Sequence, residues 1–429
     1  MPDNRKGSPR GALSRIHPAW AAPGVIGIVY LLQAATPLRL DDDAVDYLRM
    51  GTAIADGLLV PAVPVPVGYP VFLAFLDRAG LGSSFFFVLA NCVFIALGLF
   101  AAWKILSDKT VAARWSALTF ALLAIPVIKS VPIALPEAIF FGLSSLALWS
   151  MSAGHTASGR KRVALLGAAF ALTAIATSVR MVGVALAPAL LWSAAFQLDE
   201  SGHERQTKPL QTVLLGVAGL LVAALLLVVA KSGTFSVYGG WTRTYYSHGE
   251  FAAQVAKHAA TFFKIWGEVA LNVPFSRFRE SGGIFIAAGA ISAALVLSLV
   301  SRSGQLTPAR IYVLTYVVIL ALWPRPSPRL WAPIIPLIIG EVASVITRFP
   351  KARLTTALVG AYCAWFAMTG VAALAYTSRI TFSSGDFANV YGRNGGMATP
   401  SVSLRDSTSI HRRIYNEEAK RLIGRYGGR

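Results

Sequence analysis

The sequence predicts an all-α polytopic membrane protein, and three features support this fold class. Among its 429 residues only 14% are charged, 55% are hydrophobic, and the mean hydropathy is +0.59. This composition is too apolar for an ordinary soluble domain. Runs such as VLLGVAGLLVAALLLVVA at 213 to 230 approach the roughly 20 residues that cross about 30 Å of hydrocarbon. Because backbone groups in lipid must bond within their own segment, such runs are expected to be helices.

The apolar segments predict a bundle of about 11 transmembrane helices. The first follows a basic N-terminus and is interpreted as an uncleaved signal anchor, although Gln33, Ala34 and Ala35 imitate a cleavage site. The expected spans are 19 to 36, 84 to 104, 111 to 127, 132 to 152, 162 to 178, 180 to 197, 210 to 230, 282 to 300, 309 to 323, 330 to 346 and 354 to 376.

Basic residues in the short connectors predict the orientation. The connectors on the side of the N-terminus hold Lys104, Lys109, Arg114, Arg160, Lys161, Arg162, Arg205, Lys208, Arg302, Arg310, Arg348, Lys351 and Arg353. Those on the other side hold only Lys129, Arg180, Arg325 and Arg329. By the positive-inside rule, the N-terminus is cytoplasmic and the C-terminus is periplasmic. Frequent Ala, Arg and Gly indicate a GC-rich bacterial gene, and therefore a multi-pass protein of the inner membrane.

Residues 1 to 376 form the predicted membrane domain, and three long segments share its outer side. They are a first outer loop at 37 to 83, a second outer loop at 231 to 281 and a basic tail at 377 to 429. The tail, with a short helix near 409 to 426, either is solvated or binds an anionic lipid or substrate. In the second loop, a surface helix is expected from Phe251 to Trp266, with Phe251, Val255, Phe262 and Trp266 facing the membrane.

The stretch LDDDAVDYLRMG at 40 to 51 concentrates carboxylates just after an apolar run. A helix from Asp42 to Ala55 would place Asp43, Asp46 and Tyr47 on one face, beside an apolar stripe. Acids at a helix start also cap free amides, so a structural role is the alternative. Four carboxylates within six positions exceed what a cap uses, which favours proton transfer or binding of a cation.

The segment VPVPVGYPVFLAFL at 63 to 76 follows, and its prolines and glycine interrupt the chain before a second apolar helix. That helix is too brief to span a membrane. The first outer loop is therefore predicted to be two surface helices joined by a rigid connector.

Four motifs occur in order along the outer side. They are DAVDY with a trailing ADG and GYPVFLAFL, ALPEAIFFGLSSLALW (134 to 149), ATSVRMVGVALAPALL (176 to 191) and PSPRLWAPIIPLIIG (326 to 340). Together they resemble the GT-C glycosyltransferases, including the protein O-mannosyltransferase and aminoarabinose transferase branches. In the third motif Val179 and Met181 flank the arginine, whereas the family has Thr-Arg-Pro. The resemblance covers roughly residues 20 to 346.

The resemblance implies a glycosyltransferase of the membrane. Such enzymes move a single hexosyl or pentosyl group from a polyprenyl-phosphate donor to a lipid, glycan or protein acceptor on the outer face, by direct inverting displacement. Asp43 matches the position of the catalytic base, with Asp46, Tyr47 and Tyr69 in support. Neither a cofactor nor a metal is predicted, although clustered aspartates are ligands that a divalent ion accepts. The bilayer is an expected partner, and nucleic acid is not.

Arg180 and Arg329 are the candidate ligands of the donor phosphate, because a guanidinium offers two parallel donors to phosphate oxygens. For Arg180 the alternative is an ion pair with Glu137, which begins a membrane helix on the same side. For Arg329 the alternative is a side chain that extends to the membrane interface without a partner.

Other functions remain open at the level of sequence. A transporter or flippase of a lipid-linked sugar would also be polytopic, but long outer loops and the absence of a detectable inverted repeat argue against it. A ligase that moves a whole glycan, or an inactive member that acts as a scaffold, is the second alternative.

Overall fold

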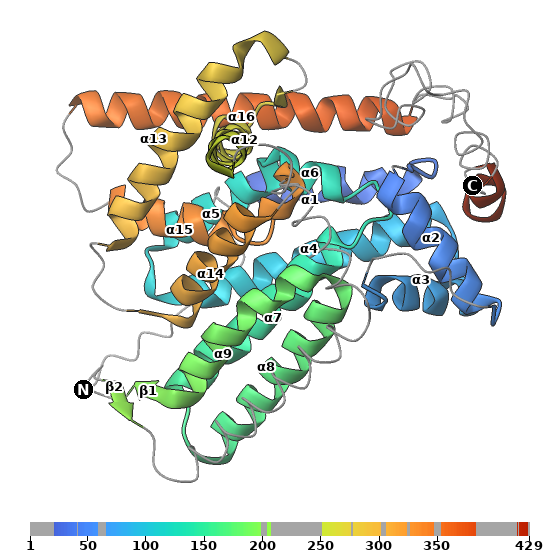
Figure 1. The fold of residues 1–429 in the computed structure, drawn as a ribbon, viewed down its shortest axis with the longest axis horizontal. Coiled ribbons are helices and arrows are strands. Elements are labelled where there is room, and N and C mark those ends of the chain that lie inside the picture. The colour runs from blue at the N-terminus through green and yellow to red at the C-terminus, as the bar shows by residue number, and fades with distance from the viewer. Residues whose placement is uncertain are drawn as a thin grey trace, which may run out of the picture.

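The computed structural model describes residues 21–40, 42–58, 66–198, 204–206, 251–275, 278–301, 306–323, 327–346, 353–382, 418 and 420–427. Within these ranges the chain is almost entirely helical (Figure 1). The exception is an antiparallel pair of short strands, β1 (Phe196–Leu198) and β2 (Glu204–Gln206). The prediction of an all-α protein missed this pair, because three residues per strand leave no alternating pattern long enough to recognise.

The helices follow one another in the order α1 (Ala21–Leu32), η2 (Gln33–Ala35), α2 (Asp42–Ala55), α3 (Gly68–Arg78), α4 (Ser84–Ile105), η3 (Leu106–Asp108), α5 (Val111–Leu123), α6 (Ile125–Ser130), α7 (Glu137–Thr156), α8 (Gly159–Val179), η4 (Met181–Ala185), α9 (Leu186–Ala195), α12 (Phe251–Leu271), η6 (Arg279–Ser281), α13 (Gly282–Ser301), α14 (Pro308–Leu322), η7 (Pro328–Trp331), α15 (Ile335–Ile346) and α16 (Arg353–Phe382). Every predicted span overlaps an apolar helix except 210 to 230, which lies outside the described residues, and the spans at 111 to 127, 180 to 197 and 330 to 346 are each divided between two or more elements. In the described part, three helices are long and apolar enough to cross a membrane: Ser84–Asp108, Gly159–Val179 and Thr356–Phe382. The predicted total of about 11 spans stays a prediction.

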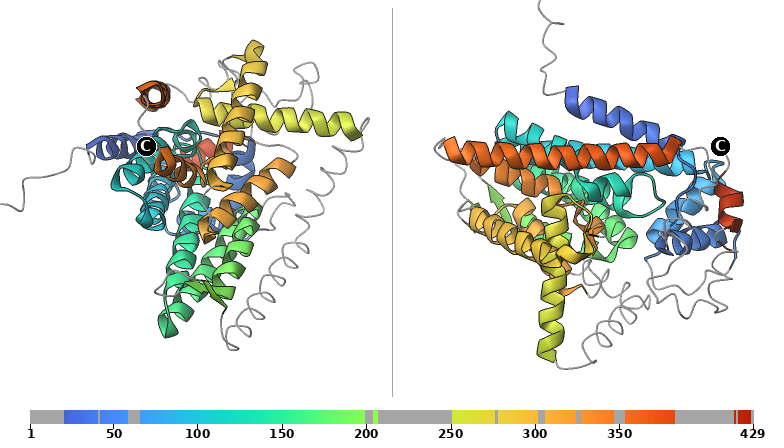
Figure 2. Two further views of the ribbon diagram at one scale, coloured as in Figure 1. Left: turned by 90° about the vertical axis from the view of Figure 1, so that its left-hand side faces the viewer. Right: turned by 90° about the horizontal axis from the view of Figure 1, so that it is seen from above.

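The bundle is built around α7, which packs against α4, α8 and α9. Figure 1 shows α7, α8 and α9 running side by side, while α2 and α3 form a separate corner. On the other side, α12 packs on α13 and α15 packs on α5, and the long α16 crosses the top of the molecule in Figures 1 and 2. The corner of α2 and α3 therefore projects from a helical core.

The predicted span from 111 to 127 is two helices, because the chain breaks at Ala124. Pro126, near the start of α6, cannot supply the backbone hydrogen bond of a helix interior. Asn272 stabilises the break: its amide donates to the carbonyl oxygen of Leu123 at 3.0 Å, and its Oδ1 accepts from the N–H of Ile125 at 2.8 Å. The freed backbone groups are thus bonded inside the protein, as an apolar environment requires.

The predicted span from 132 to 152 begins later than expected, at Glu137. The chain before it is non-helical and is held by Asn91 of α4, whose Nδ2 donates to the carbonyl oxygens of Val131 and Ile133 at 2.9 Å. Glu137 consequently lies in the first turn of α7, at the end of the helix that faces α2.

The second outer loop contains the expected helix, α12, but two of its aromatic residues face the protein. Trp266 packs on Trp331 of η7 with ring centroids 4.3 Å apart, and Phe262 lies 5.7 Å from the same ring. The expectation that Phe262 and Trp266 face the membrane is therefore wrong, because an aromatic partner from another part of the chain covers them. His258 is also buried, with Nε2 at 2.7 Å from the carbonyl oxygen of Ala321.

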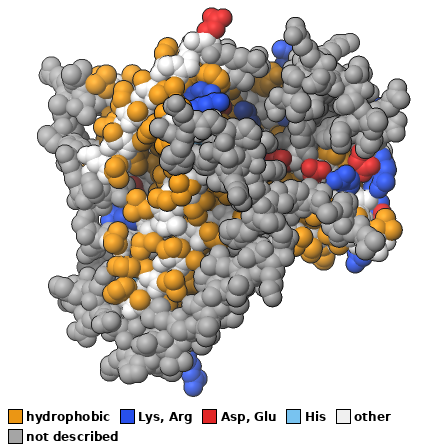
Figure 3. All heavy atoms as spheres, in the orientation of Figure 1, with side chains coloured by type: hydrophobic (Ala, Val, Ile, Leu, Met, Phe, Trp, Pro, Cys, Tyr) orange, Lys and Arg blue, Asp and Glu red, His pale blue; other side chains and the backbone are white. Residues whose placement is uncertain are grey.

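The C-terminal helix, residues 420–426, is fastened to the corner of α2 and α3. Arg425 donates to both carboxylate oxygens of Asp56, at 2.8 and 2.7 Å, and to Asp77 at 2.7 Å. The hydroxyl of Tyr426 donates to Asp77 at 3.0 Å and lies 2.8 Å from Thr52 Oγ1. Figure 3 shows these charges gathered at one corner, apart from the apolar side chains over α13 and α14. This part of the tail is therefore docked on the protein.

The docking changes the titration of both partners. Hydrogen bonds from Arg425 hold the pKa of Asp56 below its usual value of 3.8, since they favour the charged carboxylate. Burial raises the pKa of Tyr426 to about 12. Leu422, on the same C-terminal helix, is completely buried. The contact combines apolar burial with charge-assisted hydrogen bonds.

We expect Arg425→Ala to release the C-terminal helix, because three charge-assisted hydrogen bonds are lost together. Hydrogen exchange of the amides at 420–426 should become at least about tenfold faster, the change that a loss of 1.4 kcal/mol in local stability would cause. Arg421→Ala is the matched control, since Arg421 is exposed on the same helix. Equal protection in wild type and Arg425→Ala would contradict a docked helix.

Candidate active site

The predicted helix from Asp42 to Ala55 is present with those bounds as α2. Its apolar stripe faces the protein: Ala44 and Leu48 are completely buried. Asp43 lies in the first turn, and its side chain is 52% exposed. The carboxylate forms an ion pair with Nη2 of Arg329.

Tyr47 and Tyr69 join the two helices of the first outer loop. Both are buried, and their rings meet edge to face with centroids 5.2 Å apart. Gly68, which begins α3, lies so close to the end of α8 that an added Cβ would fall 2.5 Å from Ser178 Oγ and 2.6 Å from its carbonyl carbon. Only glycine permits this approach. The GYP motif therefore places the first outer loop directly beside the segment that carries Arg180.

Arg180 occupies a break between two helices. Helix α8 ends at Val179, Arg180 is extended with φ −147° and ψ 129°, and η4 starts at Met181. The turn is tight, since a Cβ on Gly183 would lie 2.7 Å from the Cα of Thr177. The resembled family has a proline where this chain has Met181, and the break forms here without it. Its consequence is a guanidinium directed toward α7.

Glu137 is the shared partner of both arginines. Its side chain is 2% exposed and forms an ion pair with Nη1 of Arg180, while Oε1 lies 3.1 Å from Nε of Arg329. The ion pair between Arg180 and Glu137, one of the two alternatives from the sequence, is confirmed. The interpretation of Arg329 as an arginine without a partner at the interface is wrong, because it bridges two carboxylates.

The short helix η7 fixes Arg329 in place. The hydroxyl of Tyr316 donates to the carbonyl oxygen of Leu330 at 2.6 Å, and both Tyr316 and the neighbouring Trp331 are buried. Trp331 is held in turn by the ring of Trp266. Arg329 is therefore a side chain on a rigid support, which is what a binding residue needs in order to keep its geometry.

These contacts form a chain of four charges, Asp43, Arg329, Glu137 and Arg180, called here the ion network. Exposure of the side chains falls from 52% at Asp43 through 25% at Arg329 to 2% at Glu137, and it is 17% at Arg180. Two guanidiniums balance two carboxylates. A narrow cleft of about 20 Å³ adjoins the network and is lined by Tyr47, Arg180 and Trp323, among others. The arrangement offers an exposed carboxylate next to one partly buried cation, Arg329, and a buried carboxylate that links this cation to a second, Arg180.

Not every predicted residue joins the network. Asp46 pairs instead with Arg49, one turn along α2, at 3.5 Å. Asp41 and Arg325 lie outside the described residues. Among the residues that are described, no group of three or more His, Cys, Asp or Glu side chains is close enough to hold a metal ion.

Arg39 was not predicted as part of the site, although it fixes the chain just before α2. It is buried, and Nη2 donates to the carbonyl oxygen of Thr377 at 3.0 Å and to Thr381 Oγ1 at 2.7 Å, both on α16. The only signal in the sequence is an arginine at the end of an apolar run. Its two partners on α16 lie 338 and 342 positions away, whereas a third partner, Thr36, is local.

The fold of this chain is similar to those of two solved proteins, ArnT and an archaeal oligosaccharyltransferase. The apo crystal structure of ArnT from Cupriavidus metallidurans is similar with a TM-score of 0.50 and 15% identity, over 96% of this chain and 78% of that one. The structure of ArnT bound to undecaprenyl phosphate has a TM-score of 0.46 and 18% identity, over 95% of this chain and 77% of that one. The oligosaccharyltransferase of Archaeoglobus fulgidus, tethered to an acceptor peptide, has a TM-score of 0.50 and 10% identity, over 94% and 59%.

No family model and no curated protein matches the sequence. The structural similarity shows a shared fold. Because the identities are only 15% and 10%, the chemistry must be argued from the site itself.

We expect Glu137→Gln to destabilise the protein by about 3 to 5 kcal/mol, because it leaves the partly buried Arg180 without its counter-charge. Asp43→Asn should cost less than about 1 kcal/mol, since the pair that it breaks is half exposed. Thermal unfolding of both variants in one detergent measures the difference. A loss at Asp43 as large as that at Glu137 would contradict the gradient of burial along the network.

Proposed function

We propose that the protein is a glycosyltransferase that moves a single sugar from a polyprenyl-phosphate donor to the hydroxyl of a lipid, glycan or protein acceptor. The observation that carries the proposal is the ion network, in which the exposed carboxylate of Asp43 pairs with Arg329 and Glu137 links Arg329 to Arg180. The fold supports it, because ArnT shares this architecture and has been crystallised with undecaprenyl phosphate.

The reaction is a direct displacement at the anomeric carbon. Asp43 accepts the proton of the acceptor hydroxyl as the oxygen attacks, which is the role of a general base. The bond from the anomeric carbon to the phosphate oxygen breaks, and its electron pair remains on the polyprenyl phosphate. The configuration inverts, with no covalent sugar intermediate. The two arginines stabilise the leaving phosphate by charge and by hydrogen bonds.

The ion pair between Asp43 and Arg329 implies that the donor binds before Asp43 acts as a base. A phosphate that takes hydrogen bonds from Arg329 competes with Asp43 for the same guanidinium nitrogens. Donor binding therefore frees the carboxylate beside the anomeric carbon, where a base is required. Glu137 holds Arg329 through Nε throughout, so the arginine changes one partner and keeps its place.

The orientation follows from the charge of the connectors. We place the ion network and the C-terminal helix on the periplasmic face of a bacterial inner membrane, with the N-terminus in the cytoplasm. The network lies at the start of α7 and at the break after α8, and charges at helix termini favour an enzyme over a transporter or flippase, which would need them within its membrane helices.

We expect Asp43→Asn to lower the turnover number at least about 100-fold, the lower limit for loss of a general base. Asp46→Asn is the matched control: Asp46 lies on the same helix, pairs with Arg49 and should lose far less activity. Mass spectrometry of lipids and envelope glycans from cells that express each variant measures the transfer. Full transfer by a folded Asp43→Asn protein would exclude Asp43 as the base.

Arg329→Lys keeps the charge but loses the fork of parallel donors that a guanidinium offers to phosphate. We expect the dissociation constant for a polyprenyl phosphate to rise about tenfold, equivalent to 1.4 kcal/mol. Binding to the purified protein, without acceptor, measures this directly. Arg49→Lys, on the same corner but outside the network, should bind as wild type does. Unchanged affinity of Arg329→Lys would remove Arg329 from the phosphate site.

A further inference from the structure

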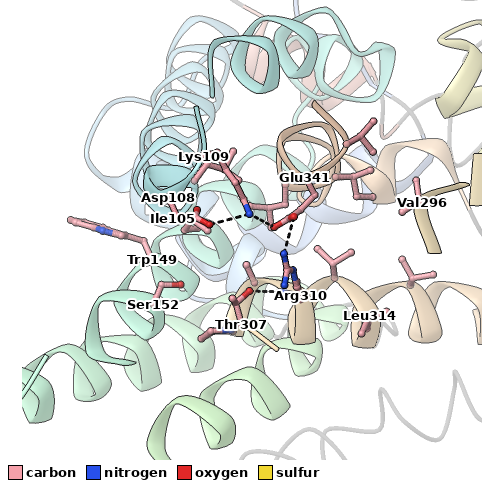
Figure 4. A pocket seen from close by; sticks show the side chains of 18 of the residues that line it. Ile105, Asp108, Lys109, Trp149, Ser152, Val296, Thr307, Arg310, Leu314 and Glu341 are labelled. Atoms are coloured by element: carbon pink, nitrogen blue, oxygen red, sulfur yellow. Dashed lines mark hydrogen bonds and ion pairs between the residues drawn. The ribbon is translucent and has the colours of Figure 1, made fainter. Parts of the chain in front are cut away.

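A second and much larger cavity, of about 690 Å³, lies away from the ion network. None of the four network residues lines it. Its walls come from α4, α7, α12, α13, α14 and α15, and Figure 4 shows the part where charged side chains meet. The cavity therefore needs an explanation of its own.

The charged end of this cavity lies at the opposite end of the bundle. Helix α7 begins at Glu137. The residues of α7 that line the large cavity run from Trp149 to Thr156, about 18 to 29 Å further along the helix axis. Helix α14 agrees: Thr307 and Arg310 line the cavity at its start, whereas Leu320 lines the cleft beside the network. The two sites thus face opposite leaflets of a membrane that this bundle spans.

The wall of the cavity is apolar and reaches the surface of the molecule. Leu297 of α13 and Leu314 of α14 line it, and they are 62% and 39% exposed. Among the described residues, hydrophobic side chains surround this region in Figure 3. In a membrane, such an opening between α13 and α14 gives access to hydrocarbon chains.

The charged end of the cavity holds a compact group of ionised side chains. Lys109 lies 3.0 Å from Asp108 and 3.2 Å from Glu341, and Arg310 lies 3.1 Å from Glu341. Figure 4 shows Lys109 and Arg310 converging on Glu341. Lys104 also lines the cavity, so three cations less two carboxylates leave one positive charge. One phosphodiester supplies the matching negative charge.

We propose that this cavity binds a membrane phospholipid of the leaflet opposite the ion network. Its acyl chains lie along the apolar wall, and its phosphate lies against Lys104 and Lys109. A donor bound at Arg329 could not place its phosphate there, because the helix separates the two ends by most of the membrane. Trp331 is buried and lines the cavity, whereas Arg329, two positions before it, does not line the cavity.

Native mass spectrometry of the purified full-length protein, stripped of lipid and then titrated with phosphatidylglycerol, tests the proposal. Wild type should bind one molecule tightly. Ser152→Trp, which fills the cavity from α7 and leaves the ion pairs in place, should abolish that binding (Figure 4). Lys104→Ala should weaken it about fivefold, the effect of one exposed charge pair. Lys161→Ala, an exposed lysine predicted on the same face, should change nothing.

A second measurement keeps the outcome clear if a variant folds poorly. Bound lipid raises the thermal midpoint of wild type, and this rise should vanish in Ser152→Trp while the lipid-free midpoint is retained. Binding by Ser152→Trp equal to wild type, or equal losses in Lys104→Ala and Lys161→Ala, would overturn the proposal. Displacement of phosphatidylglycerol by undecaprenyl phosphate would also overturn it, since the cavity would then hold the donor's chain. No transfer assay is involved, so failure here leaves the proposed enzymatic function untouched.

Discussion

The buried carboxylate of Glu137 is the constraint on which the rest of the site depends. A charge with a 2% exposed side chain is costly in an apolar bundle unless cations surround it, and two arginines from distant parts of the sequence do so. Their pairing fixes the start of α7, the break after α8 and the short helix η7 against one another. Because these three elements meet at one carboxylate, none can shift without leaving a charge unpaired.

The corner of α2 and α3 depends instead on exposed ion pairs and on a few local packing contacts. Asp43 sits at the exposed end of the network, so its bond to Arg329 can be exchanged at little cost to the fold. What holds α2 in position lies elsewhere: Gly68 against Ser178, Arg39 on α16, and Arg425 at the far end of the helix. Rigid support separated from an exchangeable ion pair is the arrangement expected of a base that must change partners.

The sequence predicted those parts of the site that depend on local pattern. Periodicity and clustered acids predicted α2 from Asp42 to Ala55. The placement of Arg180 and Glu137 at helix starts on the same side of the membrane predicted that the two could form an ion pair. It could not predict which distant surface covers a helix face. A period of 3.6 residues says that Phe262 and Trp266 share a face, but the partner, Trp331, lies 65 positions beyond Trp266. For the same reason Arg425 gave no signal of its bond to Asp56, 369 positions away.

The two sites at opposite ends of the bundle share structural elements. Trp331 lines the large cavity and stands two positions from Arg329, and α14 borders the cavity at its start and supplies Tyr316 to η7. An occupant of the cavity would therefore touch the support of Arg329, the arginine that we propose binds the donor phosphate. A bound molecule can change the population of one arrangement of η7 only if it binds that arrangement of Trp331 more tightly than another. Any coupling between the cavity and the ion network therefore depends on how differently the bound molecule binds the arrangements of Trp331. The packing of Trp266 on Trp331 restricts these arrangements and so limits the coupling.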